Sequence, residues 1–174
     1  MIDFTVEHMG WGLTWGNTVL LPFGYTMPEW TALVAPRTLT PLTIAALLLV
    51  FFLGYYIFGV ANEQRRKFRA DPKALIAGQS ARVVRTSKGR DLLVSGLWAY
   101  SRKPNYFGDL IVAWALGLPC MVLSIAPFTN AIFLTILLIQ RERRDNDWCI
   151  LKYGKQDWDQ YCRAVPYRIV PFVY

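Results

Sequence analysis

The chain has little of what a metal site or a disulfide framework needs. It contains a single histidine, His8, so a histidine-based metal site is not expected. Its three cysteines, Cys120, Cys149 and Cys162, are odd in number and have no paired spacing. This pattern favours free thiols over structural disulfides.

Charge is missing from two long stretches. No charged residue lies from Thr38 to Asn62 or from Leu110 to Gln140, and 54% of the 174 residues are hydrophobic. The composition is too apolar for an ordinary soluble domain and is typical of a small integral membrane protein. The acidic Asp3 and Glu7 near the N-terminus differ from the basic start of a signal peptide, so none is expected.

The uncharged stretches predict about four transmembrane helices. Residues 41–60 form the clearest span, because they match the length that a bilayer core requires. Residues 10–26 are uncharged but rich in glycine and polar residues, which is typical of a span packed inside a bundle. Residues 28–40 are predicted to form a short non-cytoplasmic loop between these two spans.

The second uncharged stretch is too long for one span. Residues 110–140 are interrupted by Pro119 and Pro127, so we expect a helical hairpin that turns near residues 126–130. The sequence therefore predicts an all-α integral membrane protein, with one membrane domain over residues 1–174. No internal repeat or low-complexity segment is evident.

The basic residues are concentrated in two segments. Of the 19 Lys and Arg residues, 11 lie in residues 62–105 and seven in residues 140–174. Basic loops mark the cytoplasmic side of a membrane, so both segments and both termini are expected there. Binding to nucleic acid is the other interpretation of a basic chain. It is not favoured, because apolar segments expected in the membrane flank each cluster.

The first basic segment contains residue pairs that predict the end of a helix and a turn. Asp71–Pro72 should end a helix and Lys88–Gly89 should form a turn, before residues 92–108 return to the membrane as an apolar segment. Arg65 and Arg69 share a face if the preceding helix continues outward. Two guanidinium groups so placed suit a phosphate, although spacing alone favours positive-inside anchoring at the membrane surface.

The second basic segment carries a polar stripe. On a helix, Arg141, Asp145, Cys149, Lys152 and Tyr153 fall on one face directly after an apolar run. A solvated helix does not need these residue types to be aligned, which favours a binding wall. The alternative is a juxtamembrane helix whose basic residues lie on lipid headgroups.

Three strings carry a resemblance to a known family. They are YYIFGVANEQRRKFR, LLVSGLWAYSRKPNYFGDL, and ILLIQRERRDNDWCILKYG followed by DWDQYCRAVPYRIVPFVY. The chain resembles the sterol reductase family, which includes delta-14 sterol reductases, 7-dehydrocholesterol reductase and the lamin B receptor membrane domain. The last string is similar to the family's C-terminal signature, except that Gln140 stands at its first basic position. The likeness reaches back to about His8 and corresponds to the C-terminal half of a family member.

The resemblance implies NADPH-dependent reduction of a sterol C=C bond in sterol biosynthesis, in the endoplasmic reticulum membrane of a eukaryotic cell. The sterol or a related lipid is then the substrate, and NADPH binds on the cytoplasmic side. The cofactor-binding positions carried over are Arg65, Arg69, Leu93, Trp98, Asn105, Tyr106, Asp145, Cys149, Lys152, Tyr153 and Tyr161.

The reaction also requires a proton donor within hydrogen-bond reach of the alkene. Tyr106 and Asp109 are the catalytic candidates, because Tyr106 adjoins the cofactor positions and an ionisable residue at a membrane boundary is often functional. His8 and Glu7 are further candidates, and the choice among these residues stays open at the level of sequence.

Two other functions remain possible. The KPNYFG turn also resembles the turn of isoprenylcysteine carboxyl methyltransferases and steroid 5-alpha reductases. A methyltransferase would bind S-adenosylmethionine, which has no phosphate for Arg65 and Arg69 to hold. A non-catalytic homologue that binds a sterol or a cofactor is the third interpretation.

Overall fold

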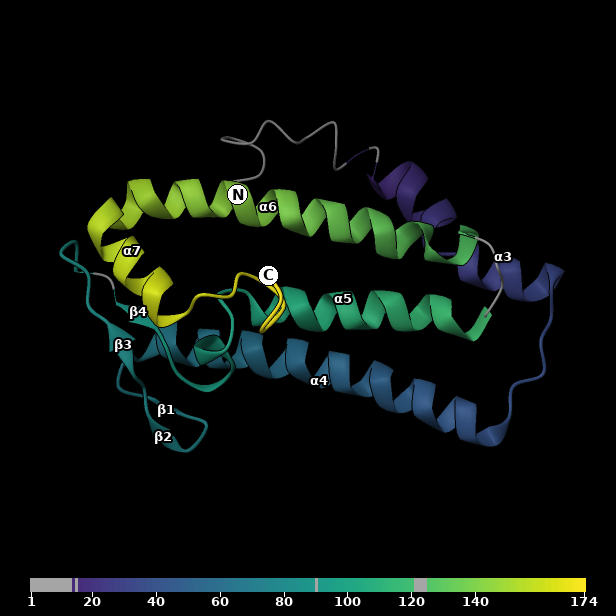
Figure 1. Ribbon diagram of the computed structural model, residues 1–174, viewed down its shortest axis with the longest axis horizontal. Coiled ribbons are helices and arrows are strands. Elements are labelled where there is room, and N and C mark those ends of the chain that lie inside the picture. Colours follow the sequence, from purple (N-terminus) through teal and green to yellow (C-terminus); the bar gives the residue numbers. More distant parts are fainter. Residues whose placement is uncertain (1–13, 15, 90, 121–124) are drawn as a thin grey trace.

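A long helix, α4 (Pro41–Ala70), runs along most of the molecule, and two further helices lie beside it (Figure 1). The computed structural model describes residue 14 and residues 16–89, 91–120 and 125–174. The C-terminal end of α4 projects beyond the start of α5 (Pro104–Gly117), toward the C-terminal end of α6 (Thr129–Tyr153) and α7 (Lys155–Ala164). This end of the bundle carries both basic segments.

The start and the end of α4 follow from its sequence. Pro41 occupies its first turn, and the Thr40 side chain accepts a hydrogen bond from the Thr43 backbone at 3.3 Å. The helix ends at Asp71–Pro72, as predicted. It is the one helix among the described residues that is long and apolar enough to cross a membrane. Because it extends ten residues beyond residue 60, Arg65 and Arg69 are helical.

The predicted hairpin is present as α5 and α6, which run antiparallel (Figure 1). Two 3₁₀ turns, η3 (Leu118–Cys120) and η4 (Ala126–Phe128), lie between them and contain the two prolines. Helix α6 then continues beyond Gln140, so that its charged second half projects out of the apolar stretch.

Glycines allow α4 and α5 to approach closely. A Cβ atom added at Gly108 would lie 2.5 Å from the Phe58 backbone nitrogen, and one added at Gly54 would lie 2.7 Å from Ile111 Cγ2. A side chain at either position would push the helices apart. This contact fixes the start of α5, and hence the residues just before it, against the projecting end of α4.

The segment between α4 and α5 differs from the prediction. It contains two antiparallel pairs of short strands, β1 (Leu75–Ile76) with β2 (Gln79–Ser80), and β3 (Val83–Val84) with β4 (Leu92–Leu93). The chain is therefore mostly helical but not all-α. The predicted Lys88–Gly89 turn joins β3 and β4, where Gly89 has φ +72°.

Residues 92–108, predicted to return to the membrane as one apolar segment, are divided into several elements in the structure. After β4 comes a 3₁₀ turn, η2 (Gly96–Ala99), and α5 begins only at Pro104. The apolar side chains of the part before α5 pack on the polar end of α4. Leu93, Trp98, Phe68 and Ile76 form one small core there.

The N-terminal part also differs from its prediction. Residues 28–40 are not all loop, because α3 (Met27–Val34) begins with Pro28 in its first turn. A π-helix, η1 (Gly16–Gly24), precedes it and covers part of the predicted first span. Residues 10–13 and 15 of that span lie outside the described residues, and so do the candidates Glu7 and His8.

Candidate functional site

A cavity of about 570 Å³ opens where α4, α6 and α7 meet. The segment from β4 to the start of α5 closes it from the remaining side. Its lining residues are Arg65, Phe68, Arg69, Pro72, Gly89, Asp91, Leu92, Leu93, Trp98, Arg102, Lys103, Glu142, Asp145, Asn146, Cys149, Lys152, Tyr153, Trp158 and Tyr161. The volume lies in the range of small-molecule and cofactor sites.

The structure brings most of the predicted site residues together. Nine of them line the cavity, namely Arg65, Arg69, Leu93, Trp98, Asp145, Cys149, Lys152, Tyr153 and Tyr161. Asn105, Tyr106 and Asp109 do not line it. Asn105 is buried in the first turn of α5, and its Oδ1 has no hydrogen-bond partner. Asp109 is half-buried on α5.

The stripe on α6 faces the cavity with a slightly different register. Arg141 is outside the lining, whereas Glu142 and Asn146 are inside it. The spacing alone could have indicated both residues, because Glu142 and Asn146 are each one turn from neighbours in the stripe. Glu142 is buried and pairs with Arg168 at 3.1 Å.

Arg65 and Trp98 form one corner of the cavity. The Arg65 guanidinium lies 5.3 Å from the centroid of the Trp98 ring, within the range of a cation–π contact. Trp98 Nε1 donates to the Ala61 carbonyl at 2.9 Å, which fixes the ring against α4. Arg69 is one turn further along α4 and is exposed.

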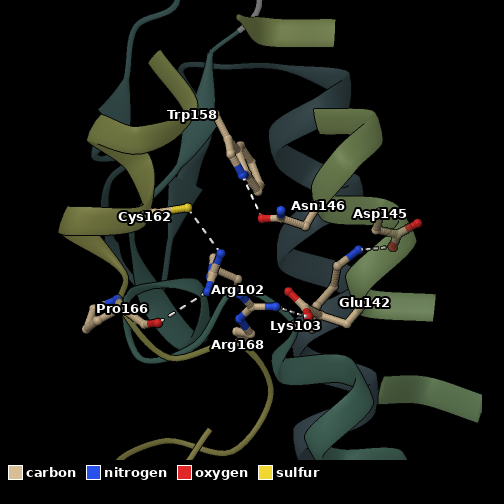
Figure 2. A network of polar contacts seen from close by, with 9 residues as sticks. All are labelled: Arg102, Lys103, Glu142, Asp145, Asn146, Trp158, Cys162, Pro166 and Arg168. Atoms are coloured by element: carbon tan, nitrogen blue, oxygen red, sulfur yellow. Dashed lines mark hydrogen bonds and ion pairs between the residues drawn. The ribbon is translucent and has the colours of Figure 1, made fainter. Parts of the chain in front are cut away.

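Asp145 has partners across the cavity from its own helix. Lys103 Nζ forms an ion pair with Asp145 Oδ2 (Figure 2). The Tyr106 hydroxyl also donates to Asp145 Oδ2, at 3.4 Å, and Lys103 Nζ lies 5.2 Å from the Tyr106 ring centroid. Tyr106 therefore contacts a lining residue although it does not line the cavity. Lys103 was not among the predicted site residues.

Aromatic side chains build the wall formed by α6 and α7. The Tyr153 and Trp158 rings are stacked with centroids 6.2 Å apart, and Trp158 and Tyr161 are 5.1 Å apart. Trp158 Nε1 donates to Asn146 Oδ1 at 2.9 Å (Figure 2). Burial raises the pKa of the Tyr161 phenol, so this side chain is neutral at physiological pH.

The turn between β3 and β4 is tied to this wall. The backbone N–H and the hydroxyl of Ser87 both donate to Asp157 Oδ2 at 2.7 Å, and these hydrogen bonds lower the pKa of Asp157. Lys88 Nζ donates to the Leu151 carbonyl at 3.0 Å. The contacts hold the turn, and with it Gly89 and Asp91, at the rim of the cavity.

Positive charge predominates in the cavity. Five lining residues are basic and three are acidic. Of the acidic residues, Asp145 pairs with Lys103 and Glu142 pairs with Arg168. This arrangement fits an anionic ligand, and the aromatic wall offers faces for a planar group. Among the described residues, no group of three or more His, Cys, Asp or Glu side chains is placed to hold a metal ion.

Comparisons with known proteins agree along the whole chain. The model of the Ergosterol biosynthesis ERG4/ERG24 family matches residues 1–174. The chain is 41% identical over 172 residues to the Delta(14)-sterol reductase of Methylotuvimicrobium alcaliphilum, covering 99% of this chain and 40% of that protein. It is 40% identical over 174 residues to the Delta(14)-sterol reductase TM7SF2 of Mus musculus, covering 99% and 41%. For the Delta(14)-sterol reductase of Arabidopsis thaliana the identity is 42% over 172 residues, covering 99% and 45%. The chain thus spans about two fifths of the length of these relatives.

Proposed function

The chain belongs to the ergosterol biosynthesis ERG4/ERG24 family, and on this premise we propose that its cavity binds NADPH for the reduction of a sterol C=C bond. The named relatives are Delta(14)-sterol reductases, which makes the Δ14 bond the first substrate to test. The chain covers only part of each relative. Family membership therefore does not by itself give this chain the activity or the sterol site of the whole proteins, and both are part of the proposal.

The excess of basic side chains in an aromatic-walled cavity is the observation that carries the proposal. NADPH has a pyrophosphate and a 2′-phosphate, together with two ring systems. Arginine forks bind phosphate oxygens in pairs, and aromatic faces stack on rings. S-adenosylmethionine has no phosphate, and it carries a positively charged sulfonium group. A cationic cavity therefore fits it less well.

The lining residues then take separate roles in cofactor binding. Arg65 and Arg69, both on α4, hold a phosphate of the cofactor, and the Trp98 ring positions Arg65. Leu93 and Trp98 provide an apolar face, and Cys149, Lys152, Tyr153 and Tyr161 form the opposite wall. We propose Asn105 as a further hydrogen-bonding residue, because its buried Oδ1 has no partner.

Bound NADPH would supply a hydride to one alkene carbon. The chain must deliver a proton to the other carbon in a site that excludes water. We propose Tyr106 as the donor ahead of Asp109, because the Tyr106 hydroxyl contacts Asp145 at the edge of the cavity. Lys103 forms an ion pair with the same carboxylate oxygen that accepts this hydrogen bond, so it holds Asp145 beside the Tyr106 hydroxyl.

For the membrane arrangement we propose four spans, with the cavity on the cytoplasmic side. Helix α4 supplies the clearest span, and the apolar parts of α5 and α6 supply two more. The cavity lies between the two basic segments, which the positive-inside rule places in the cytoplasm. In a eukaryotic cell the membrane is that of the endoplasmic reticulum.

Titration of the purified chain with NADPH and with S-adenosylmethionine tests the proposal. Saturable binding of NADPH alone is the expected result, followed by NADPH-dependent loss of the double bond when a Δ14-sterol is added. Binding of S-adenosylmethionine alone would instead support a methyltransferase. Binding of NADPH without sterol reduction by this chain would support a cofactor-binding homologue.

A further inference from the structure

Arg102 is a buried cation at the edge of the cavity. It lies two residues before α5, is 8% exposed and lines the cavity. Its Nη1 donates to Cys162 Sγ at 3.1 Å and its Nη2 to the Pro166 carbonyl at 3.3 Å (Figure 2). Both acceptors are neutral, and the thiol is a weak one.

The charge of Arg102 has no acidic partner among the described residues. The two nearby carboxylates in Figure 2 are already paired, Asp145 with Lys103 and Glu142 with Arg168. Arg102 Nε is buried and has no hydrogen-bond partner. A buried guanidinium normally pairs with an anion, because its desolvation is costly otherwise. The missing anion is therefore expected to come from a ligand.

We propose that Arg102 binds the pyrophosphate of the dinucleotide, while Arg65 and Arg69 hold the 2′-phosphate. This assignment deepens the proposed NADPH site and rests on it. Two observations support it. First, Arg65 and Arg69 lie on α4 whereas Arg102 lies just before α5, and NADPH likewise has two separate anionic groups. Second, Arg69 is exposed at the rim whereas Arg102 is buried. The pyrophosphate, at the centre of the cofactor, suits the deeper cation.

The start of α5 adds to the same site. Arg102 and Lys103 directly precede this 14-residue helix, whose N-terminal end carries a partial positive charge. Lys103 is already paired with Asp145, so Arg102 is the cation left to meet an incoming anion at this end of α5. A guanidinium beside a helix N-terminus is a favourable environment for phosphate oxygens.

A purely structural role for Arg102 makes a different prediction. Its backbone N–H donates to the Tyr167 carbonyl at 2.9 Å, and its side chain holds Cys162 and Pro166, so it also links the C-terminal segment to α5. In that role, any change that removes these side-chain contacts would disturb the cavity, whether or not the positive charge is kept. Cys162→Ala removes one contact and keeps the charge, which makes it the matched control.

The test measures the affinities for NADPH and NADH of four purified full-length proteins. These are the parent and the variants Arg102→Gln, Arg102→Lys and Cys162→Ala. Both dinucleotides contain the pyrophosphate, so Arg102→Gln should weaken both by about tenfold or more and leave their ratio unchanged. Arg102→Lys should recover part of the loss, and Cys162→Ala should bind both like the parent. Inorganic pyrophosphate should displace NADH from the parent and equally from Arg69→Ala, a measurement that does not depend on how the Arg102 variants fold.

Several results would overturn the assignment. Parental NADH affinity in Arg102→Gln would remove Arg102 from the pyrophosphate site, and a loss confined to NADPH would place it on the 2′-phosphate. Equal losses in Cys162→Ala and Arg102→Gln would show that Arg102 is only a structural link. Pyrophosphate that fails to compete with NADH would show that the cavity has no pyrophosphate site. A parent chain that binds neither dinucleotide would instead refute the NADPH site itself, and this assignment with it.

Discussion

The Arg65 guanidinium lies 5.3 Å from the centroid of the Trp98 ring, and this contact joins two segments that are far apart in the sequence. Trp98 Nε1 donates a hydrogen bond to the carbonyl of Ala61, which lies one turn before Arg65 on α4. The ring therefore holds the cationic end of Arg65 at the cavity. The phosphate-binding role proposed for Arg65 depends on this position.

Trp98→Phe should test that dependence. The substitution removes a buried hydrogen bond and part of the ring, so it should lower the free energy of unfolding by about 1–3 kcal/mol. It should also weaken NADPH binding several-fold, because the Arg65 side chain is held less firmly. Thermal unfolding in detergent and cofactor titration measure the two effects.

Trp114→Phe is the matched control for this change. Trp114 Nε1 donates to Thr135 Oγ1 at 3.1 Å on the apolar part of the bundle, away from the cavity. This variant loses the same kind of hydrogen bond and should bind NADPH like the parent. Equal losses of NADPH affinity in the two variants would contradict a specific role for Trp98.

Arg69→Ala should weaken NADPH binding by about tenfold and NADH binding much less, because it removes a charged contact to the 2′-phosphate. Equilibrium titration with both dinucleotides measures the ratio. Arg66→Ala is the control, since Arg66 is exposed on the same helix, bonds to Glu63 and does not line the cavity. Equal losses for NADPH and NADH would remove Arg69 from the 2′-phosphate site.

Cys149 should be alkylated slowly at neutral pH. Burial raises the pKa of this thiol, and only the thiolate reacts, so the rate should keep rising as the pH is increased above the ordinary range for cysteine. Bound NADPH should protect Cys149, which lines the cavity, but not Cys162, which does not. Mass spectrometry after iodoacetamide treatment follows both sites. Equal protection of the two cysteines would indicate general tightening of the fold.

The four-span arrangement predicts that position 85 faces the cytoplasm. A cysteine introduced there, in a chain whose own cysteines are replaced, should react with an impermeant maleimide only from the cytoplasmic side of sealed vesicles. Arg85 is exposed near the turn between β3 and β4, so the reagent can reach this position. Labelling only after access to the lumen would overturn the arrangement.

The sequence predicted α4, the hairpin and most of the cavity, because each depends on local signals. Uncharged length, proline and one-turn spacing are all visible without the fold. The resemblance to a family supplied the residues that spacing does not join, such as Leu93 and Trp98. Both lie on elements between α4 and α5 that the sequence did not indicate.

Other features depend on contacts between distant segments and could not be predicted in the same way. The paired strands have only two residues each, too few for a periodic pattern. The ion pair of Lys103 with Asp145 joins residues 42 positions apart. The isolation of Arg102 becomes evident only when the partners of the neighbouring carboxylates are known.

If the cavity binds NADPH through the polar face of α6, the carboxylate of Asp145 is the group on that face whose loss should weaken binding most, and Asp145→Asn removes it. Asp145 keeps Lys103 in place and is expected to accept hydrogen bonds from the cofactor. Loss of one charged hydrogen bond costs about 1.5–3 kcal/mol, or roughly a tenfold to hundredfold loss of affinity. Asp147→Asn is the control, because Asp147 is exposed on the same helix outside the cavity. In a titration with NADPH, Asp145→Asn should bind tenfold to a hundredfold more weakly and Asp147→Asn should match the parent, while both variants insert normally into the membrane. Parental NADPH affinity in Asp145→Asn would show that this face of α6 does not bind the cofactor and would leave the α6 stripe as a membrane-surface anchor.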